Sequence, residues 1–473
     1  MSRLVIVSNR VSLPRRNAAP GGLVVGVLAA MQRRGGLWFG WNGERAVSGE
    51  QPAEEMQRNG ISYVTIELDD TEYSDFYQGF CNGILWPLFH YFLNGFHYSE
   101  QQFEAYLRFS QRVARELLPR LTPHDLIWVH DYHFLPLAQK LREAGATQPL
   151  GLFIHTPFPA AEVLRALPVC GELVQAMLAF DLIGFQTESD LRAFAGSVAS
   201  LWGIESISAD ADMIEVGGHR TRLGVFPIGV DVDGVQQQAR EAQQGDACRR
   251  MLAGLLGRKL MIGVDRLDYS KGLVERFRAY ERFLEMHPDQ QNRVTYLQIA
   301  PLSRADVRAY STIRRELEQA AGRTNGRFAD TDWTPIRYLN RNFPHDVVVG
   351  FMRAAPVGLV TPLRDGMNLV AKEFVAAQDD DDPGVLILSS MSGAARELDE
   401  ALLVNPYDTR GIANAIDRAL NMPLAERRER HQAMMTTLRQ NDVHAWHDRF
   451  LAALAATSRS QSSATRVSKT ITA

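Results

Sequence analysis

Residues 357–373 read VGLVTPLRDGMNLVAKE, and this stretch decides the fold class. Its first five residues form a short apolar run that predicts a buried strand. Gly366 predicts a turn, and a helix is expected to begin at or close to Asn368. The turn carries the Asp365 carboxylate beside unpaired backbone N–H groups of a helix N-terminus, which attract anions. Together these features indicate a strand–turn–helix unit with a polar ligand at the turn.

Glu373 follows Asp365 by eight residues, which is about two turns of an α-helix. This spacing places Glu373 where a second polar part of the same ligand can bind. A capped helix with ordinary surface charges gives the same local pattern, however. The rest of the chain has to decide between the two interpretations.

Short apolar runs alternate with helical patterns along the chain, which predicts parallel sheets buried on both faces. The expected strands are Leu4–Val7, Leu126–Val129, Leu150–Ile154, Leu182–Phe185, Leu260–Val264, Thr295–Ile299, Val357–Val360, Val385–Leu388 and Leu402–Val404. One sheet of so many strands is not expected, so we predict two doubly wound α/β domains. The predicted domains are residues 1–229 and 230–455. Residues 44–60 are expected to form a β-hairpin or loop, and residues 457–473 a disordered tail.

The composition is that of an ordinary globular protein, with 473 residues, 45% hydrophobic and 22% charged. A net charge of −4 gives no basic field for nucleic acid or a membrane surface. The three cysteines, Cys81, Cys170 and Cys248, have neither disulfide nor zinc spacing, which fits a reducing compartment. With no signal peptide and no membrane-spanning run recognised, we expect a cytoplasmic protein. The sequence leaves a homodimer or homotetramer open.

Open α/β sheets bind ligands beyond the carboxyl ends of their strands, and two such domains are expected to leave a cleft. Arg266 and Lys271 directly follow the predicted strand Leu260–Val264. Two cations on one turn suit a diphosphate and can stabilise a leaving phosphate. The alternative is a surface salt-bridge cluster with Asp265 and Asp268.

Other polar residues follow the predicted strands of the first domain. Arg10 ends the first strand, and Gly21-Gly22 lies in the next loop, where glycines let the backbone approach a phosphate. His130-Asp131 and His155 end two further strands, which favours a polar substrate pocket. A metal site is not expected, because these segments contain no HxH or HxxxH pair.

Two further patterns need an interpretation. Tyr77 and Trp86 belong to an aromatic-rich segment, which is more often core, but either ring could pack against a sugar. The segment Asp330–Thr334 fits the DxDxT pattern of phosphatases that form an aspartyl-phosphate. No continuous apolar strand precedes it, so we interpret it as a chance match.

The motifs together resemble the trehalose-6-phosphate synthases, a family of retaining glycosyltransferases. The matching segments are Ser8–Arg10, Gly21–Leu23, Trp38–Trp41, Trp86–Pro87, Val129–His133, His155–Pro159, Asp265–Gly272 and Thr361–Glu373. Their order and spacing extend from residue 1 to about 455. The resemblance implies the GT-B fold, with two Rossmann-like domains facing a central cleft and a last helix near 443–454 crossing back to the first domain. Long members carry a C-terminal phosphatase domain, which is not expected here, so the phosphorylated product should be released.

The resemblance also implies that UDP-glucose and glucose 6-phosphate give α,α-trehalose 6-phosphate and UDP, in osmotic or stress protection, without a metal or other cofactor. The implied donor-binding residues are Gly21, Gly22, Arg266, Lys271, Phe343, Asp365, Gly366, Met367, Asn368, Leu369, Val370, Ala371, Lys372 and Glu373. The implied acceptor residues are Arg10, Tyr77, Asp131 and Arg304, with both arginines on the 6-phosphate. Trp86 and Thr156 are implied to shape the pocket, and Arg266, Lys271, Asp365 and His155 to be catalytic.

Several alternatives remain at this point. Front-face displacement, in which the leaving phosphate accepts the proton of the attacking hydroxyl, competes with a mechanism that uses Asp365 as nucleophile. A catalytically inactive, sugar-phosphate-sensing paralogue and a GT-B enzyme with another acceptor are the competing functions. The sequence does not specify the base of the donor nucleotide.

Overall fold

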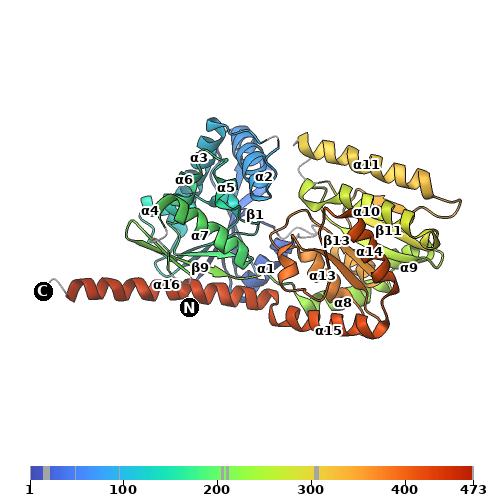
Figure 1. Cartoon of the computed structure of the whole chain (residues 1–473). Coiled ribbons are helices and arrows are strands. Elements are labelled where there is room, and N and C mark those ends of the chain that lie inside the picture. The colour runs from blue at the N-terminus through green and yellow to red at the C-terminus, as the bar shows by residue number, and fades with distance from the viewer. Residues whose placement is uncertain are drawn as a thin grey trace. The chain divides into compact units, whose positions relative to one another are not determined.

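The computed structural model describes residues 2–13, 22–47, 49–94, 96–203, 207–208, 212–302 and 308–470. The chain folds into two compact units, Met1–Ile228 with Val443–Ala473 and Gly229–Asp442. The predicted domain boundary at residue 229 lies one residue from this division. Each unit contains one sheet with helices packed on it (Figure 1). In the described part of the chain, no helix is long and apolar enough to cross a membrane.

The first unit is built on a nine-stranded sheet with the order β3-β4-β2-β1-β5-β6-β7-β9-β8. Its strands are β1 (Leu4–Arg10), β2 (Gly36–Arg45), β3 (Glu54–Arg58), β4 (Ile61–Leu68), β5 (Leu126–His130), β6 (Leu150–Phe153), β7 (Leu182–Phe185), β8 (Met213–Val216) and β9 (His219–Val225). The edge strands β3 and β8 are antiparallel to their neighbours, and the other pairs are parallel. Apart from the antiparallel edge strands β3 and β8, chain order runs outward in both directions from the β1–β5 pair. This pair is therefore the topological switch point of the sheet, where ligands bind in open α/β folds.

Helices cover this sheet and complete its core. They are α1 (Gly22–Arg34), the π-helix η1 (Glu72–Leu85), α2 (Trp86–Phe89), α3 (Glu100–Leu117), α4 (Leu137–Glu143), α5 (Ala161–Leu164), α6 (Cys170–Met177), α7 (Glu188–Trp202) and α16 (Val443–Thr470). Helix α16 docks through Phe450, whose ring stacks on Trp128 of β5 with centroids 4.6 Å apart. A Cβ on Gly151 or Gly184 would lie within 2.9 or 2.8 Å of the Phe450 ring. Glycine at these two strand positions therefore makes room for the helix.

Helix α16 also bears on the prediction for the C-terminal residues. The helix continues to Thr470, through most of the segment for which the sequence predicts a disordered tail. Thr457 is buried, and its hydroxyl donates a hydrogen bond to the Leu454 carbonyl at 2.7 Å. Residues 471–473 and the side chains from residue 458 onward lie outside the described residues, so disorder of the tail stays a prediction.

The second unit contains a six-stranded, fully parallel sheet with the order β12-β11-β10-β13-β14-β15. Its strands are β10 (Lys259–Val264), β11 (Val294–Ile299), β12 (Ile336–Leu339), β13 (Val357–Val360), β14 (Val385–Ser389) and β15 (Leu402–Val404). In chain order this is the 3-2-1-4-5-6 arrangement of dinucleotide-binding folds, with the switch point between β10 and β13.

Two helical layers enclose this second sheet. The helices are α8 (Val232–Gln243), α9 (Asp246–Ala253), α10 (Leu273–Met286), α11 (Arg308–Phe328), α12 (His345–Arg353), α13 (Leu369–Ala377), α14 (Thr409–Asn421) and α15 (Leu424–Gln440). Helix α10 packs with α11 and α14 in one layer, and α8 packs with α12 and α13 in the other (Figure 1). The sheet is thus buried on both faces, as its continuous apolar strands predict.

All nine predicted strands are present, and the four parallel strands that were missed are β2, β4, β9 and β12. Within the described part of the segment 44–60, for which a hairpin or loop was predicted, only β3 is a complete strand; it forms an antiparallel hairpin with β4, which lies beyond that segment. Asn59 and Gly60 close it with φ angles of 51° and 76°. Two successive positive φ angles are typical of the type I′ turn, which matches the twist of a hairpin.

Candidate active site

The switch point of the second unit brings two predicted donor residues together. Strands β10 and β13 are neighbours, so the loops that follow them meet at one edge of the sheet. The Lys271 Nζ lies 2.5 Å from the Asp365 Oδ2, and both side chains are largely buried. The Leu363 N–H donates to the Ser270 carbonyl at 2.8 Å, which ties the two loop backbones together.

A buried network supports the loop of residues 265–272 from beneath. The fully buried Arg276 donates to Asp265 Oδ2 at 2.7 Å, to Thr361 Oγ1 at 3.0 Å and to Gln298 Oε1 at 3.0 Å. Burial raises the pKa of the Asp265 carboxyl, and the Arg276 charge opposes this shift. The Asp265 carboxylate is therefore buried and paired with Arg276. The alternative of a surface salt-bridge cluster with Asp265 is wrong.

The second acidic residue of this loop is also structural. Asp268 accepts hydrogen bonds from the Ser270 N–H at 2.9 Å and from the Tyr310 hydroxyl at 2.8 Å. Gly272 ends the loop with φ = 63°, and a Cβ there would lie 2.5 Å from the Thr361 carbonyl oxygen. The Arg266 side chain remains exposed, with no ion-pair partner among the described residues. A cation is therefore presented to solvent at the switch point.

The helix start after β13 is fixed by one side chain. Asn368 adopts φ = 84° and caps α13, with its Oδ1 accepting from the Ala371 N–H at 3.1 Å. Its Nδ2 donates to the Asp365 Oδ2 at 3.0 Å. The N–H groups of Leu369 and Val370, in the first turn, have no acceptor within the helix. The predicted helix start at or close to Asn368 is confirmed, and it leaves an anion-attracting terminus beside Asp365.

Three other predicted donor residues lie along the same layer of helices. Glu373, on α13, accepts from His345, with the His345 Nε2 and the Glu373 Oε1 3.2 Å apart. Lys372 is fully buried and pairs with Glu397 at 2.6 Å, and burial lowers the pKa of its ammonium group. Phe343 precedes α12, and the Arg341 guanidinium lies 4.6 Å from its ring centroid.

In the first unit, an aromatic ring links two of the predicted acceptor residues. Arg10 ends β1 opposite Trp41 of β2, and its guanidinium lies 4.7 Å from the Trp41 ring. The Tyr77 ring centroid lies 5.0 Å from that of Trp41 and 6.3 Å from that of His133. The Trp41 ring thus contacts both the Arg10 guanidinium and the Tyr77 ring.

Asp131 follows β5, the strand next to β1, so it belongs to the same switch point as Arg10. Its backbone has φ = 73° and ψ = 174°, a region that residues other than glycine rarely occupy. Such strain costs about 1–3 kcal/mol and is concentrated at functional sites. The Asp131 Oδ1 accepts from the His155 backbone N–H at 3.2 Å, which links the ends of β5 and β6.

His155 is held by a second histidine. The His130 Nδ1 and the His155 Nε2 are 3.0 Å apart. Burial lowers the pKa of His155 to about 3. The pKa of His130 also lies well below its ordinary value; burial is the larger cause, and the neighbouring histidines are the smaller one. Both rings are therefore neutral at physiological pH, and His155 can orient a hydroxyl but not supply a cation.

The remaining predicted residues are placed as follows. Trp86 is buried, with its ring 4.1 Å from His90 and 6.0 Å from Tyr132. Thr156 is also buried, and its hydroxyl has no hydrogen-bond partner among the described residues. Gly22 is the first residue of α1. Gly21 and Arg304 lie outside the described residues.

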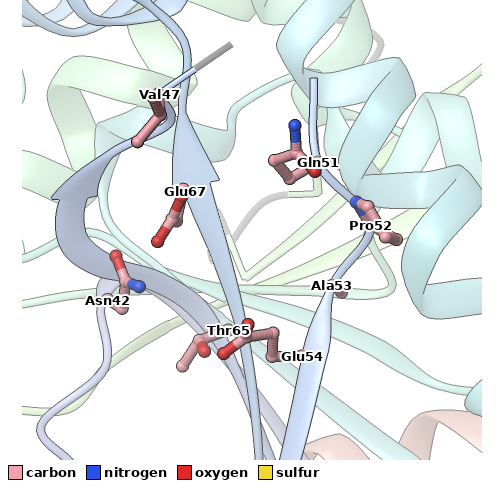
Figure 2. Close-up of a pocket in the computed structure, with 8 residues that line it drawn as sticks. All are labelled: Asn42, Val47, Gln51, Pro52, Ala53, Glu54, Thr65 and Glu67. Atoms are coloured by element: carbon pink, nitrogen blue, oxygen red, sulfur yellow. The ribbon is translucent and has the colours of Figure 1, made fainter. Parts of the chain in front are cut away.

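A surface hollow of about 410 Å³ lies elsewhere in the first unit, beside the hairpin of β3 and β4 (Figure 2). It is lined by Asn42, Val47, Gln51, Pro52, Ala53, Glu54, Thr65 and Glu67. None of these belongs to the predicted site, and the two charged residues are acidic, which does not suit a phosphate. Across the described ranges, no group of three or more His, Cys, Asp or Glu side chains is placed to hold a metal ion.

Sequence reasoning missed three residues that shape the site. Arg276 supports the β10 loop from a helix, Trp41 joins Arg10 to Tyr77, and His345 contacts Glu373. Trp41 could have been found, because it belongs to an aromatic motif that the sequence analysis recognised. The partners of Arg276 and His345 lie up to 107 residues away in the chain, and no local signal indicates them.

Two Rossmann-like units, one of which presents cations and a helix N-terminus at its switch point, define a glycosyltransferase of the GT-B class. Residues 4–456 match the family model of glycosyltransferase family 20, and the chain belongs to that family. A trehalose-6-phosphate synthase of Klebsiella pneumoniae is 47% identical over 452 residues, covering 95% of this chain and 94% of the relative.

Two solved structures of similar enzymes contain substrate-like ligands. A UDP-forming alpha,alpha-trehalose-phosphate synthase from Burkholderia xenovorans, in complex with glucose-6-phosphate, is 48% identical with a TM-score of 0.92, covering 96% of this chain and 100% of that chain. The E. coli protein bound with UDP-2-fluoro glucose is 43% identical with a TM-score of 0.90, covering 96% and 99%. The predicted fold class and the predicted resemblance to trehalose-6-phosphate synthases are confirmed.

Proposed function

We propose that this chain transfers glucose, with retention of configuration, from UDP-glucose to glucose 6-phosphate, giving α,α-trehalose 6-phosphate and UDP. The observation that carries the proposal is the group formed by Lys271, Asp365 and the start of α13 at the switch point of the second unit. This arrangement offers cations and free backbone N–H groups to a diphosphate, and a carboxylate to a sugar. The ligands of the two similar structures are of these chemical kinds.

The second unit binds the donor in this proposal. Arg266 and Lys271 contact the diphosphate, together with the N–H groups of Leu369 and Val370. Asp365 contacts the hydroxyls of the transferred glucose. Glu373 accepts hydrogen bonds from the ribose hydroxyls, and Phe343 lies against the base.

The first unit binds the acceptor. Arg10 contacts the 6-phosphate, and its position over Trp41 limits the conformations of its long side chain. Tyr77 and Asp131 hold the sugar, and Arg304 adds a second cation for the phosphate. A polymer-elongating enzyme has no use for cations that select an acceptor phosphate, so these residues favour glucose 6-phosphate as acceptor.

We favour front-face displacement for the chemical step. The bond between the glucose C1 and the UDP oxygen breaks while the acceptor hydroxyl attacks from the same face, and the hydroxyl proton passes to the leaving phosphate. Lys271 and Asn368 both donate to the Asp365 Oδ2, and such hydrogen bonds make a carboxylate a weaker nucleophile. Arg266 and Lys271 stabilise the charge of the leaving UDP, by about 3–4 kcal/mol for one such contact.

One assay tests the function against its alternatives. The protein is incubated with UDP-glucose and glucose 6-phosphate, and UDP release is followed while NMR identifies the linkage of the product. We expect UDP release and an α,α-linked disaccharide phosphate, unchanged by EDTA, and much slower turnover with unphosphorylated glucose. Ligand binding without UDP release would instead favour a sensing protein. Equal rates with glucose would indicate another acceptor, and parallel reactions with ADP-glucose and GDP-glucose define the base preference.

The proposal includes a cytoplasmic location. None of Cys81, Cys170 and Cys248 forms a disulfide, which suits a reducing compartment. Fractionation of the producing cells tests the location directly, and recovery of the protein with the membranes would contradict it.

A further inference from the structure

We propose that His345 is a positioning residue, which holds Glu373 in the orientation that binds the donor's ribose. The inference rests on the proposed function, in which Glu373 accepts hydrogen bonds from the ribose hydroxyls. It adds a residue that lies outside the segments that carry the family resemblance. The residue should have a measurable effect on recognition of the 2′-hydroxyl of the ribose.

Three helices of the second unit meet at this histidine. The His345 Nε2 lies 3.2 Å from the Glu373 Oε1 on α13, and the His345 Nδ1 lies 3.0 Å from the Gln238 Oε1 on α8. Helices α8, α12 and α13 pack against one another, so the backbones that carry these three side chains are held in place. His345 is therefore fixed at both ring nitrogens, and it fixes one oxygen of Glu373 in turn.

The two partners also favour the protonated form of the ring. Both nitrogens face oxygen acceptors, and only the imidazolium form donates from both at once. The hydrogen bond to Glu373 raises the pKa of His345, and burial opposes the shift. Among the described residues, the charged groups that act on His345 are Glu373 on α13 and Asp346 on α12, while Gln238 on α8 is neutral. The pair is therefore an ion pair at low pH and weakens as His345 loses its proton.

The second oxygen of Glu373 is left for a ligand. His345 occupies the Oε1, and the Oε2 has no partner in the part of the chain that the structure describes. A carboxylate that is already held loses less conformational freedom when it binds a ribose, which favours affinity. Phe343, which we place against the base, lies two residues before His345. One segment thus supplies the contact to the base and the support for the contact to the ribose.

A purely structural role for His345 would make a different prediction. If the ring only joined α8 to α12, its removal would lower stability and weaken all nucleotides equally. A positioning role instead changes the preference for a ribose over a deoxyribose. The ratio of the dissociation constants of dUDP and UDP isolates this preference, because both nucleotides carry the same base and the same titrating phosphates.

The experiment measures this ratio by titration calorimetry at pH 6.0 and pH 8.5. It compares the unsubstituted protein with the variants His345→Ala, His345→Gln and Glu373→Gln. The matched control is His287→Ala, which removes another histidine of the second unit that lies beside an aspartate, with the His287 Nδ1 3.5 Å from the Asp417 Oδ1. We expect the unsubstituted protein to prefer UDP by about tenfold at pH 6.0, the effect of one charge-assisted hydrogen bond.

The expected results distinguish a failure of the His345 role from a failure of the proposed function. His345→Ala and Glu373→Gln should both bring the ratio close to 1, and His287→Ala should leave it unchanged. His345→Gln keeps a neutral donor, so it should retain part of the preference with no change between the two pH values. A ratio that survives His345→Ala but is lost in Glu373→Gln would overturn the inference and leave the proposed function intact. A ratio unaffected by Glu373→Gln would overturn the ribose assignment itself.

Discussion

Replacing Lys271 by methionine should slow turnover far more than it destabilises the fold. The substitution keeps the length of the side chain and removes the charge that lies 2.5 Å from Asp365. Loss of one preorganised donor to a leaving group costs about 2.7–4 kcal/mol in the transition state, so kcat should fall about 10²–10³-fold. Asp365 keeps its hydrogen bond from Asn368 at 3.0 Å, and its side chain is 14% exposed. Its carboxylate charge therefore stays hydrogen-bonded and in contact with water. The free energy of unfolding should therefore fall by only about 1–2 kcal/mol.

Steady-state UDP release measures the first effect, and thermal unfolding measures the second. Lys140→Met is the matched control, because Lys140 pairs with Glu143 at 3.0 Å on the surface of the first unit. It should leave kcat unchanged, since exposed pairs contribute about 0–1 kcal/mol to stability and neither Lys140 nor Glu143 belongs to the predicted site. Full turnover in Lys271→Met would refute the role of this cation. A loss of activity that only parallels a loss of folded protein would refute it as well.

Three further predictions address separate parts of the structure. Arg10→Met should raise the KM for glucose 6-phosphate about 10–100-fold, because a charge-assisted hydrogen bond to the acceptor phosphate is lost. The KM for UDP-glucose should stay unchanged, and equal changes in both constants would contradict the assignment. Gly272→Ala should lower the midpoint of thermal unfolding, because the φ of this residue is 63° and the new Cβ would lie 2.5 Å from the Thr361 carbonyl oxygen. Gly322→Ala is the control and should leave the midpoint unchanged, because a Cβ there meets no atom within 4 Å. His155 has a pKa of about 3 in the fold against 6.5 normally, so the unfolded chain takes up its proton first and stability should fall as pH drops from about 6.5 towards 3. Thermal melts across this range should show a weaker acid dependence for His155→Gln, and an unchanged dependence would contradict the buried neutral ring.

The sequence predicts those parts of the fold in which local pattern and burial coincide. Strands such as Val357–Val360 are buried along their whole length, so the apolar run and the strand have the same limits. The cap at Asn368 was predictable for the same kind of reason, because a glycine turn and a helical pattern adjoin it. The strand His219–Val225 was missed because only two of its seven residues are buried and no apolar run marks it.

Strand order could not be obtained from the sequence, and neither could the contacts that depend on it. Nothing local indicates that β1 lies between β2 and β5, and this order is what places Arg10 at a switch point with Asp131. The network around Arg276 could not be predicted for the same reason, since its bonds reach Thr361, directly after β13, and Gln298 in β11. Predicting which residues follow strands is therefore easier than predicting which of them meet.

The docking of α16 on the first unit has a consequence for synthesis of the chain on the ribosome. Phe450 fills the space above Gly151 and Gly184, yet it is translated after the entire second unit. The second unit, residues Gly229–Asp442, is continuous in the chain and can complete its sheet while α16 is still in the exit tunnel. The first unit is thus synthesised first but completed last, because its strands are covered only after α16 has left the tunnel. A nascent chain that stops at residue 442 would expose the Trp128 ring and become a substrate for chaperones.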